Sequence, residues 1–396
     1  MNKGTGFRGR IWRWVLAVLG IIGLCVLAWT VIFREPAEQV QAGVIGITLP
    51  DDAAGYTRAE GPQPLVFPRD HGPHPDFQTE WWYYTGNLET AEGRRFGYQL
   101  TFFRRAVTPP AEAQARDSSW GSNQVYMAHF TLTDVAEQQF YYAERFERGA
   151  AGLAGAQGEP AYEVWLRDWT VRQLAADEYQ LTAKHEGMAI DLRMVDTKGP
   201  VLQGDQGYSR KGPEPGNASI YYSQTYLEST GTVTIAGTNY AVSGLSWLDR
   251  EISTSVLSEG QVGWDWFALH LDDGSELMVF RLRRADGSAD PYSAGLYVAA
   301  DGSSRTLSGE DFEIVPKGTW RSPHSGGAYP AEFTVRVPFL ELELEIQPQV
   351  ADQELNVSFI YWEGSIQAAG SRAGRAITGL GYAELTGYAE SFEGRF

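Results

Sequence analysis

Two carboxylates lie beside an indole in the stretch Leu245–Ile252. If this stretch is a strand, Trp247, Asp249 and Glu251 share one face, and the Cβ atoms of the two acids are about 7 Å apart. Proximity and desolvation push the pKa values of such a pair apart, which leaves one acid protonated and the other ionised. A pair such as Asp249 and Glu251 could protonate an alkene and activate water, so both are candidate catalytic residues. The alternative is a structural network in which Arg250 and neighbouring bases pair with them, or a strand that turns them to solvent.

A third candidate for acid–base chemistry is His129, in the run Tyr126–Phe130. It is either a general acid or base inside the first domain or a hydrogen-bonded core histidine. His71 and His74 lie close together, but two ligands without a third do not make a metal site, so we predict no metal. The sequence also lacks a phosphate loop, a Gly-x-Ser-x-Gly elbow and a His-Glu-x-x-His motif. We predict no cofactor.

Aromatic residues are frequent, with 13 Trp, 20 Tyr and 18 Phe. Such side chains either fill a core or form the wall of an apolar binding site, where they also stabilise a cation. Because Asp265 alternates with two tryptophans, either this acid or the two indoles face a cavity, but not both. We expect five aromatic residues to bind a hydrophobic ligand in a cavity between two domains: Trp81, Tyr83, Trp247, Trp264 and Trp266.

The elements that position these residues are strands. From about residue 60 onward, period-2 alternation dominates and helical periodicity is scarce. In 340–346 the even positions are apolar and the odd ones acidic, whereas apolar residues in 333–337 fall at odd positions. A bulge or bend at Pro338-Phe339 would reconcile the two faces. Segments 232–236 and 240–245, on either side of a Gly237-containing turn, predict a hairpin.

An internal repeat organises these strands. Trp81-Trp82-Tyr83-Tyr84 and Trp264-Asp265-Trp266-Phe267 each lie four residues before a leucine and then a turn, at an offset of 183 residues. That spacing is too long for a solenoid unit and is typical of a duplicated domain. We predict an all-β protein of two tandem antiparallel barrels, over 61–238 and 239–396, because barrel closure removes exposed strand edges.

The N-terminal segment differs from the rest. Residues 14–33 are uncharged and mostly apolar and would span about 30 Å as a helix, the thickness of a bilayer core. Four basic residues precede them, so the positive-inside rule places the tail 1–13 in the cytoplasm. We predict a single-pass, uncleaved transmembrane helix over 14–33, a linker over 34–60, and barrels in the bacterial periplasm, tethered to the inner membrane.

Charge and cysteine content exclude other classes. The chain has 32 basic and 50 acidic residues, a net charge of −18. Residues 35–396 alone carry −23, which argues against nucleic acid as a partner. One cysteine excludes an intramolecular disulfide framework.

Several motifs resemble the AttH/CrtC-like family over about residues 60–396. The resemblance implies tandem lipocalin-like (calycin-type) barrels in a family that includes carotenoid 1,2-hydratases (hydroxyneurosporene synthases), kievitone-type hydratases and Diels–Alder cyclases. It also implies, for bacterial AttH-like members, exported partners of ABC transporters. The motifs are His74–Leu88, Gly97–Arg104, Ala128–Phe130, Trp247–Glu251, Gly263–Phe267 and Gly381–Tyr388.

The chain departs from the hydratase branch in one place. In the corresponding region of that branch, which is similar to this chain up to the aspartate, a His-Asn-Trp run follows. This chain has Arg250-Glu251-Ile252 there instead. The Tyr-x-Asp pair of that branch falls near Phe280 and Leu282. The catalytic residues of the carotenoid enzymes are therefore not transferred to this chain.

Two functional hypotheses follow. The first is a membrane-anchored, periplasm-facing protein that binds a hydrophobic small molecule and works with an ABC transporter permease. The second is an enzyme, a hydratase, lyase or isomerase that acts on an isoprenoid or polyketide-like alkene through Asp249 and Glu251.

Overall fold

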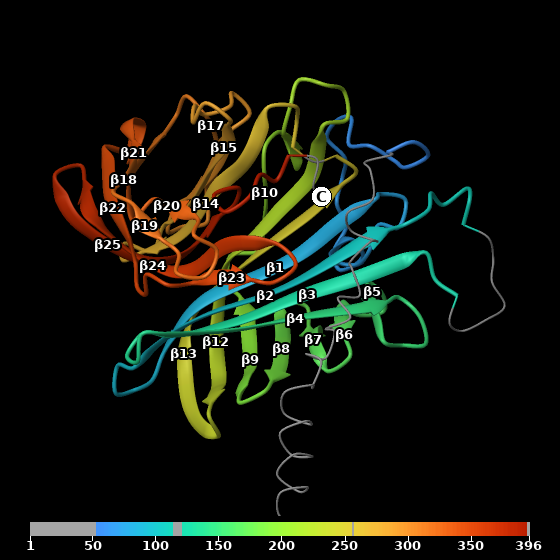
Figure 1. The fold of residues 1–396 in the computed structure, drawn as a ribbon, viewed down its shortest axis with the longest axis horizontal. Coiled ribbons are helices and arrows are strands. Elements are labelled where there is room, and N and C mark those ends of the chain that lie inside the picture. Colours follow the sequence, from blue (N-terminus) through green and yellow to red (C-terminus); the bar gives the residue numbers. More distant parts are fainter. Residues whose placement is uncertain (1–52, 114–120, 256, 394–396) are drawn as a thin grey trace, which may run out of the picture. The chain divides into compact units, whose positions relative to one another are not determined.

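The computed structural model describes residues 53–113, 121–255 and 257–393. In this part of the chain the fold is all-β, built mainly from two large antiparallel sheets that curve like barrels (Figure 1). Its helical elements are two 3₁₀ turns, η1 (Arg69–His71) and η2 (Pro338–Leu340).

The membrane prediction lies outside this part of the chain. The predicted tail 1–13, the transmembrane helix 14–33 and linker residues 34–52 all precede the first described residue. Among the described residues, no helix has the length and apolar character needed to cross a membrane.

The first sheet has 13 strands and is almost closed. Its two edge strands, β4 and β5, follow each other in the chain. The short strands β10 (Pro200–Leu202) and β11 (Tyr208–Arg210) pair beside the main path with β12. The main path runs through β4 (Gln139–Arg148), β3 (Gln124–Asp134), β2 (Arg95–Ala106), β1 (Thr79–Glu89), β13 (Thr238–Ser253), β12 (Ala218–Ile235), β9 (Met188–Asp196), β8 (Glu178–His185), β7 (Trp169–Ala175), β6 (Glu163–Leu166) and β5 (Ala154–Gln157).

The second sheet has 10 strands. Strand β23 (Glu354–Asn356) pairs beside its main path with β24, and β19 (Trp320–Arg321) forms a separate ladder with β20 (Ala328–Tyr329). The main path runs through β17 (Ser304–Ser308), β16 (Ala294–Val298), β15 (Glu276–Arg284), β14 (Gln261–Leu271), β25 (Arg375–Leu385), β24 (Ile360–Arg372), β22 (Leu342–Pro348), β21 (Glu332–Val337) and β18 (Glu313–Lys317).

The repeat in the sequence corresponds to equivalent strands. In the first sheet β1 pairs with the following β2, and in the second β14 pairs with the following β15. The change of sheet comes between Ser253 and Gln261, because β13 pairs with β1 and β12. The predicted boundary at 238/239 therefore falls inside the first sheet, at the β12–β13 hairpin.

The two turns predicted from alternation have different outcomes. The hairpin between β12 and β13 is present, and Ala236 and Gly237 have φ of 51° and 81°, as its tight turn requires. The bulge or bend predicted at Pro338-Phe339 is a full turn, because β21 and β22 pair with each other and η2 lies between them. The chain reverses direction at this turn. This reversal, and not a bulge, explains why the apolar residues change from odd to even positions.

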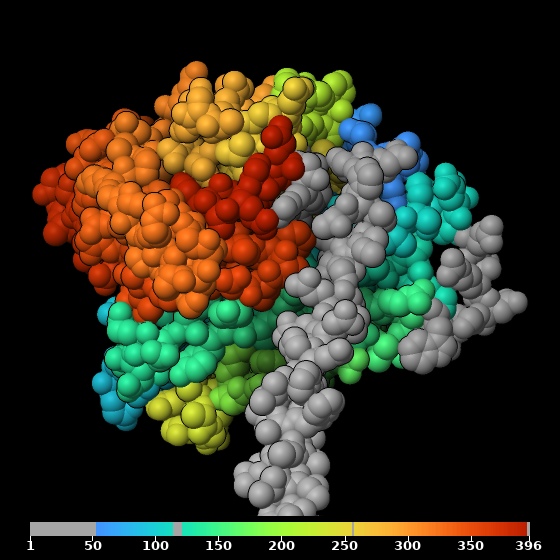
Figure 2. All heavy atoms as spheres, viewed as in Figure 1, coloured from blue at the N-terminus to red at the C-terminus, as the bar shows by residue number. Residues whose placement is uncertain are grey.

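The strands that face the other sheet have two buried faces. Trp82 and Tyr84 of β1 belong to the core inside the first sheet, and Phe267 of β14 belongs to the core inside the second. Tyr83 and Trp266 alternate with them and belong to a third cluster between the sheets. Figure 2 shows the second sheet, orange to red, packed against the cyan and green strands of the first.

Polar contacts join the two sheets where they meet. The Asn87 side chain donates a hydrogen bond to the Gly381 carbonyl at 2.8 Å, and the Thr131 and Tyr382 hydroxyls are 3.0 Å apart. Gly97 lies so close to the second sheet that a Cβ atom there would be 2.4 Å from the Cβ of Ser365. The sheets are therefore in close contact around the site described next.

Candidate functional site

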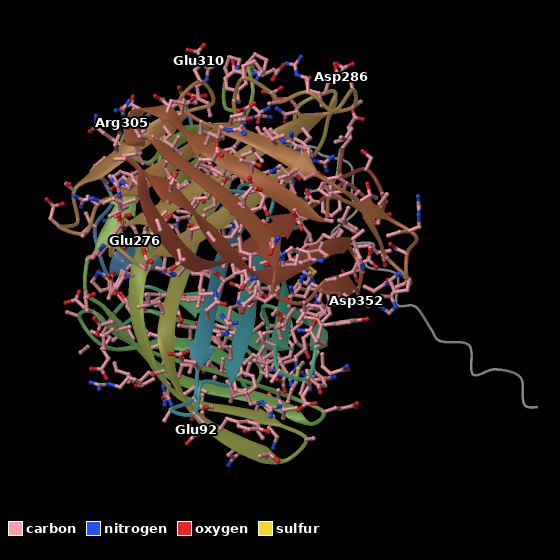
Figure 3. The ribbon with its side chains drawn as sticks, turned by 90° about the vertical axis from the view of Figure 1, so that its left-hand side faces the viewer. Glu92, Glu276, Asp286, Arg305, Glu310 and Asp352 are labelled. Atoms are coloured by element: carbon pink, nitrogen blue, oxygen red, sulfur yellow. The ribbon has the colours of Figure 1, made fainter. Side chains whose placement is uncertain are left out.

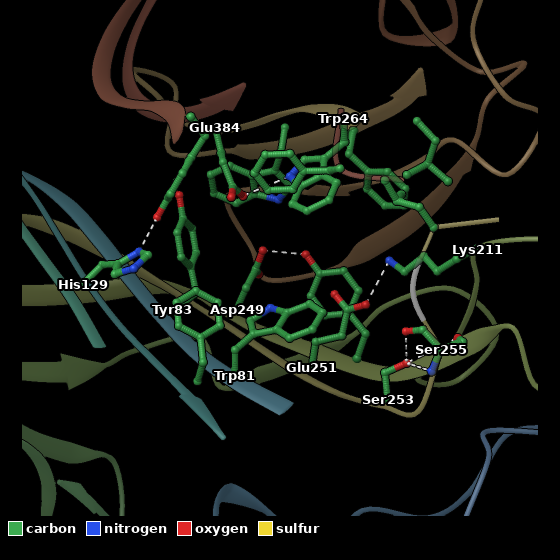
Figure 4. A pocket seen from close by; sticks show the side chains of 18 residues that line it. Trp81, Tyr83, His129, Lys211, Asp249, Glu251, Ser253, Ser255, Trp264 and Glu384 are labelled. Atoms are coloured by element: carbon green, nitrogen blue, oxygen red, sulfur yellow. Dashed lines mark hydrogen bonds and ion pairs between the residues drawn. The ribbon is translucent and has the colours of Figure 1, made fainter. Parts of the chain in front are cut away.

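A cavity of about 140 Å³ lies between the two sheets. Figure 4 shows Glu384 and Trp264 of the second sheet across the cavity from Asp249 and Glu251 of the first. Among the described residues, packed hydrophobic side chains form a core inside each sheet, whereas this cavity lies between the sheets. The cavity is lined by Trp81, Tyr83, Phe103, His129, Lys211, Tyr221, Asp249, Glu251, Ser253, Ser255, Leu257, Trp264, Trp266, Phe280, Leu282, Tyr361, Glu384 and Phe392.

Most residues singled out in the sequence lie at this cavity. They are Asp249, Glu251 and His129, together with Trp81, Tyr83, Trp264 and Trp266. Trp247 does not line it and is 1% exposed behind Asp249. Asp265 faces the interior of the second sheet, where Arg281 pairs with it at 2.5 Å. The two indoles that flank Asp265 therefore face the cavity, and the acid does not.

Asp249 is held by three hydrogen-bond donors. The Tyr221 hydroxyl donates at 2.5 Å, the Ser223 hydroxyl at 2.5 Å and the Trp247 indole N–H at 2.7 Å. Burial raises the pKa of Asp249 to about 6, because the three donors only partly offset the loss of water. At neutral pH Asp249 is mostly ionised and fixed in place.

Glu251 is paired with a loop lysine. The Lys211 Nζ atom lies 3.1 Å from its carboxylate. The same ammonium lies 4.4 Å from the ring centroid of Phe280 and 4.9 Å from that of Tyr221. Arg250, between the two acids in sequence, points to the opposite face and pairs with Glu80. Among the described residues, Arg250 therefore forms no ion pair with Asp249 or Glu251, and the base that pairs with Glu251 is Lys211.

Glu384 is the acid that the sequence analysis did not single out. Its carboxylate accepts a hydrogen bond from the Trp264 indole at 3.1 Å. Burial, and then the charges of Asp249 and Glu251, raise the pKa of Glu384 to about 7. A carboxyl group with a pKa in this range can both hold and release a proton near neutral pH. Its position in the motif Gly381–Tyr388 was the available signal, but Asp249 and Glu251, whose charges add to the rise in its pKa, lie on the other sheet.

A second buried acid lies directly across the ladder from Glu384. Glu363 of β24 is the cross-strand partner of Glu384 of β25. The Tyr83 hydroxyl donates to Glu363 Oε1 at 2.5 Å, and burial followed by the charge of Glu384 raises the pKa of Glu363 well above its usual range. Glu363 is therefore a buried acid with a raised pKa behind the cavity wall.

His129 connects the cavity with the outer side of the first sheet. Its Nδ1 atom lies 2.7 Å from the Tyr361 hydroxyl, which lines the cavity, and its Nε2 atom lies 3.0 Å from Glu144. A carboxylate only accepts, so Nε2 carries the proton and Nδ1 accepts from the tyrosine. Glu144 also accepts from the Ser358 hydroxyl at 2.8 Å. This chain of groups resembles the arrangement that increases the basicity of a hydroxyl group.

The other two histidines singled out in the sequence, His71 and His74, lie elsewhere. His71 is buried inside the first sheet with its Nδ1 atom 2.6 Å from the Tyr222 hydroxyl, and burial lowers its pKa to about 3. His74 lies 3.4 Å from Asp70. Within the described parts of the chain, no group of three or more His, Cys, Asp or Glu residues is arranged to hold a metal ion.

Comparison with known proteins gives the following relatives. A family model described as AttH-like matches residues 58–388. The structure of an AttH protein from Nitrosomonas europaea is 33% identical with a TM-score of 0.73, and the alignment covers 84% of this chain and 99% of that one. No protein with a curated function matches the chain.

Two more distant structures share the fold. Kievitone hydratase from Nectria haematococca is 13% identical with a TM-score of 0.63, covering 87% of this chain and 99% of that one. CghA is 10% identical with a TM-score of 0.50, covering 85% and 96%. Identities this low show a common fold and nothing about the reaction.

Proposed function

We propose that this chain, which belongs to the AttH-like family by its match over residues 58–388, is an acid–base enzyme of the hydratase, lyase or isomerase type. Its substrate would be an apolar, unsaturated small molecule. The observation that carries the proposal is Glu384, an acid with a pKa of about 7 that faces an aromatic cavity. An apolar binding site alone gives no reason to bury three carboxyl groups, because each costs free energy. Acid catalysis near neutral pH requires such a group.

The first step is proton transfer from Glu384. Protonated Glu384 donates its proton to one carbon of the double bond, the π electrons form the new C–H bond, and the neighbouring carbon becomes cationic. The faces of Trp81 and Trp266 stabilise that cation by their negative π surfaces. The carboxylates of Asp249 and Glu251 add an electrostatic contribution across the cavity.

The second step consumes the cation. Either a neighbouring carbon loses a proton, which isomerises the alkene, or a water oxygen bonds to the cation and loses a proton, which hydrates it. In both cases the Tyr361 oxygen takes that proton while its own moves to His129 Nδ1, and Glu144 balances the imidazolium. One proton leaves Glu384 and one reaches His129, so solvent exchange resets both groups.

Deuterium incorporation tests the proposal. The full chain is incubated in D₂O at pH 7 with a panel of small branched and cyclic alkenes, allylic alcohols and enones, and carbon-bound deuterium is measured by mass spectrometry. We expect exchange that falls at least ~100-fold in Glu384→Gln. The matched control is Glu276→Gln. Glu276 has a pKa raised to about 7 by burial, but it pairs with Lys198 at 2.6 Å and does not line the cavity. Figure 3 labels Glu276 for comparison.

That control sets the criterion for failure. Equal exchange in the Glu384 and Glu276 variants would show that Glu384 is not the proton donor. Absence of exchange with every compound in the panel would count against an enzyme and favour the second candidate.

The second candidate is a binding protein for a hydrophobic small molecule. It is favoured by the predominance of aromatic residues at the cavity and by Asp249, which is already occupied by three donors of the protein itself. Mass spectrometry of compounds that co-purify with the native chain tests it. A co-purifying apolar molecule that is released from the protein chemically unaltered would support binding without turnover.

The remaining sequence-based expectations stay predictions. We infer that the two curved sheets are tandem lipocalin-like (calycin-type) barrels, as the two-copy strand order supports. The inner-membrane anchor over 14–33, the periplasmic location and an ABC transporter permease as partner are proposals that fractionation and cross-linking would test.

A further inference from the structure

An ammonium group of the protein itself already lies against the aromatic wall. Lys211 Nζ is within 5 Å of two ring centroids, at 4.4 Å from Phe280 and 4.9 Å from Tyr221, and its counterion Glu251 is 3.1 Å away. The Lys211 side chain is 17% exposed, so water contributes little to its solvation there. Attraction between a cation and a ring face is larger when the cation is desolvated. This wall therefore suits an organic cation.

The remaining wall of the cavity is formed by aromatic rings that stand at steep angles to one another. The rings of Tyr83 and Trp266 meet at 90° with centroids 5.1 Å apart, and those of Trp264 and Phe392 meet at 83° with centroids 5.7 Å apart. All four of these residues line the cavity, so aromatic side chains of different orientation surround the space, as they do around quaternary ammonium groups in proteins. The cavity of about 140 Å³ resembles in size the ~150 Å³ cavity known to hold benzene. A trimethylammonium group fits such a space.

The charges of the cavity are unbalanced. Lys211 is the only Lys or Arg side chain among the residues that line it, and its charge is matched by Glu251. Asp249 accepts hydrogen bonds only from uncharged donors, and Glu384 accepts one from an indole. Among the described residues, therefore, neither acid has a cationic partner within salt-bridge distance. A ligand that brings a positive charge would supply one.

We propose that the cavity binds small apolar ammonium ions, in the space between the indole rings and the carboxylates of Asp249 and Glu384. The inference rests on the proposed function in one respect: such ions imitate the cation formed when the substrate is protonated. It also specifies the ligand class, since a compound with the same shape but without charge has no electrostatic attraction to the two acids.

A pair of isosteric probes tests this. Choline and its neutral isostere 3,3-dimethylbutan-1-ol differ in whether nitrogen or carbon is at the centre of the trimethyl group. Binding of each to the full chain is measured by titration calorimetry and by quenching of tryptophan fluorescence. We expect choline to bind about tenfold more tightly than the alcohol. Equal binding, tighter binding of the alcohol, or no binding of choline would each overturn the inference.

Two variants locate the probe. Asp249→Asn removes a charge, so the preference for choline should fall several-fold, whereas the control Glu276→Gln should leave it unchanged. Lys211→Met removes the competing ammonium and leaves Glu251 unpaired, so choline should bind more tightly than to the native chain. Because the two variants change affinity in opposite directions, partial unfolding cannot imitate both results. A weaker affinity for choline in Lys211→Met would contradict the inference.

The outcome is separable from that of the deuterium experiment. A preference for choline without deuterium exchange would retain the cation site and reject the enzyme. Exchange without that preference would retain the enzyme and reject the cation site.

Discussion

Strands β1 and β13 carry charged or aromatic residues on both faces. Buried carboxyl groups on the two faces have pKa values shifted in opposite directions. Inside the first sheet, Glu80 is fully buried between the guanidinium groups of Arg104 and Arg250. These charges hold the pKa of Glu80 well below its usual range despite the burial. On the other face, Asp249 is also buried but has only neutral donors, and its pKa is raised to about 6.

The comparison separates a structural acid from a reactive one. A buried carboxylate matched by two arginines stays ionised and cannot exchange protons at neutral pH. A carboxyl group that is buried with like charges nearby, such as Glu384, has a pKa near neutrality and can exchange them. Because side chains alternate along a strand, one strand pair supports both kinds of site without mixing them.

The largest effect is expected inside the first sheet. Glu80→Gln leaves Arg104 and Arg250 buried without a counter-charge, which should lower the free energy of unfolding by about 3–5 kcal/mol. Urea denaturation followed by circular dichroism measures this. A loss below about 1 kcal/mol would mean that water reaches the arginines and that the contrast between the two faces is smaller than the structure indicates.

At the cavity the opposite sign is expected. The pKa of Glu384 is raised from 4.5 to about 7 in the folded state, so stability falls as pH rises between these values and stays reduced above them. Glu384→Gln removes that penalty and should stabilise the protein by on the order of 3 kcal/mol at pH 8, with little effect near pH 5. Thermal unfolding at both pH values gives the comparison. Equal stabilisation at the two pH values would point to packing instead of charge.

The smallest effect concerns the coupling between the two sheets. Asp249→Asn removes a negative charge that disfavours ionisation of Glu384, so the pKa of Glu384 should fall by about one unit. Titration of labelled glutamate side chains by NMR measures the shift. A pKa that stays the same would mean that burial alone keeps Glu384 protonated.

The local elements could be read from the sequence, but the pairing between sheets could not. Alternation placed Trp81 and Tyr83 on one face of β1 and Asp249 and Glu251 on one face of β13, because strand periodicity needs no partner. Glu384 was missed because its raised pKa depends first on burial in the fold and then on charges more than 130 positions away, on the other sheet. Lys211 lies in a loop, where no periodicity indicates direction.

Glu384 belongs to one sheet, whereas Asp249 and Glu251, whose charges weaken it as an acid, belong to the other. Its strength as an acid therefore depends on the contact between the two sheets, and neither sheet provides it alone. A methyl group added at Gly97, where the sheets touch, would push the two sheets apart. Such remote substitutions offer evolution a way to adjust proton donation without altering any residue that meets the ligand.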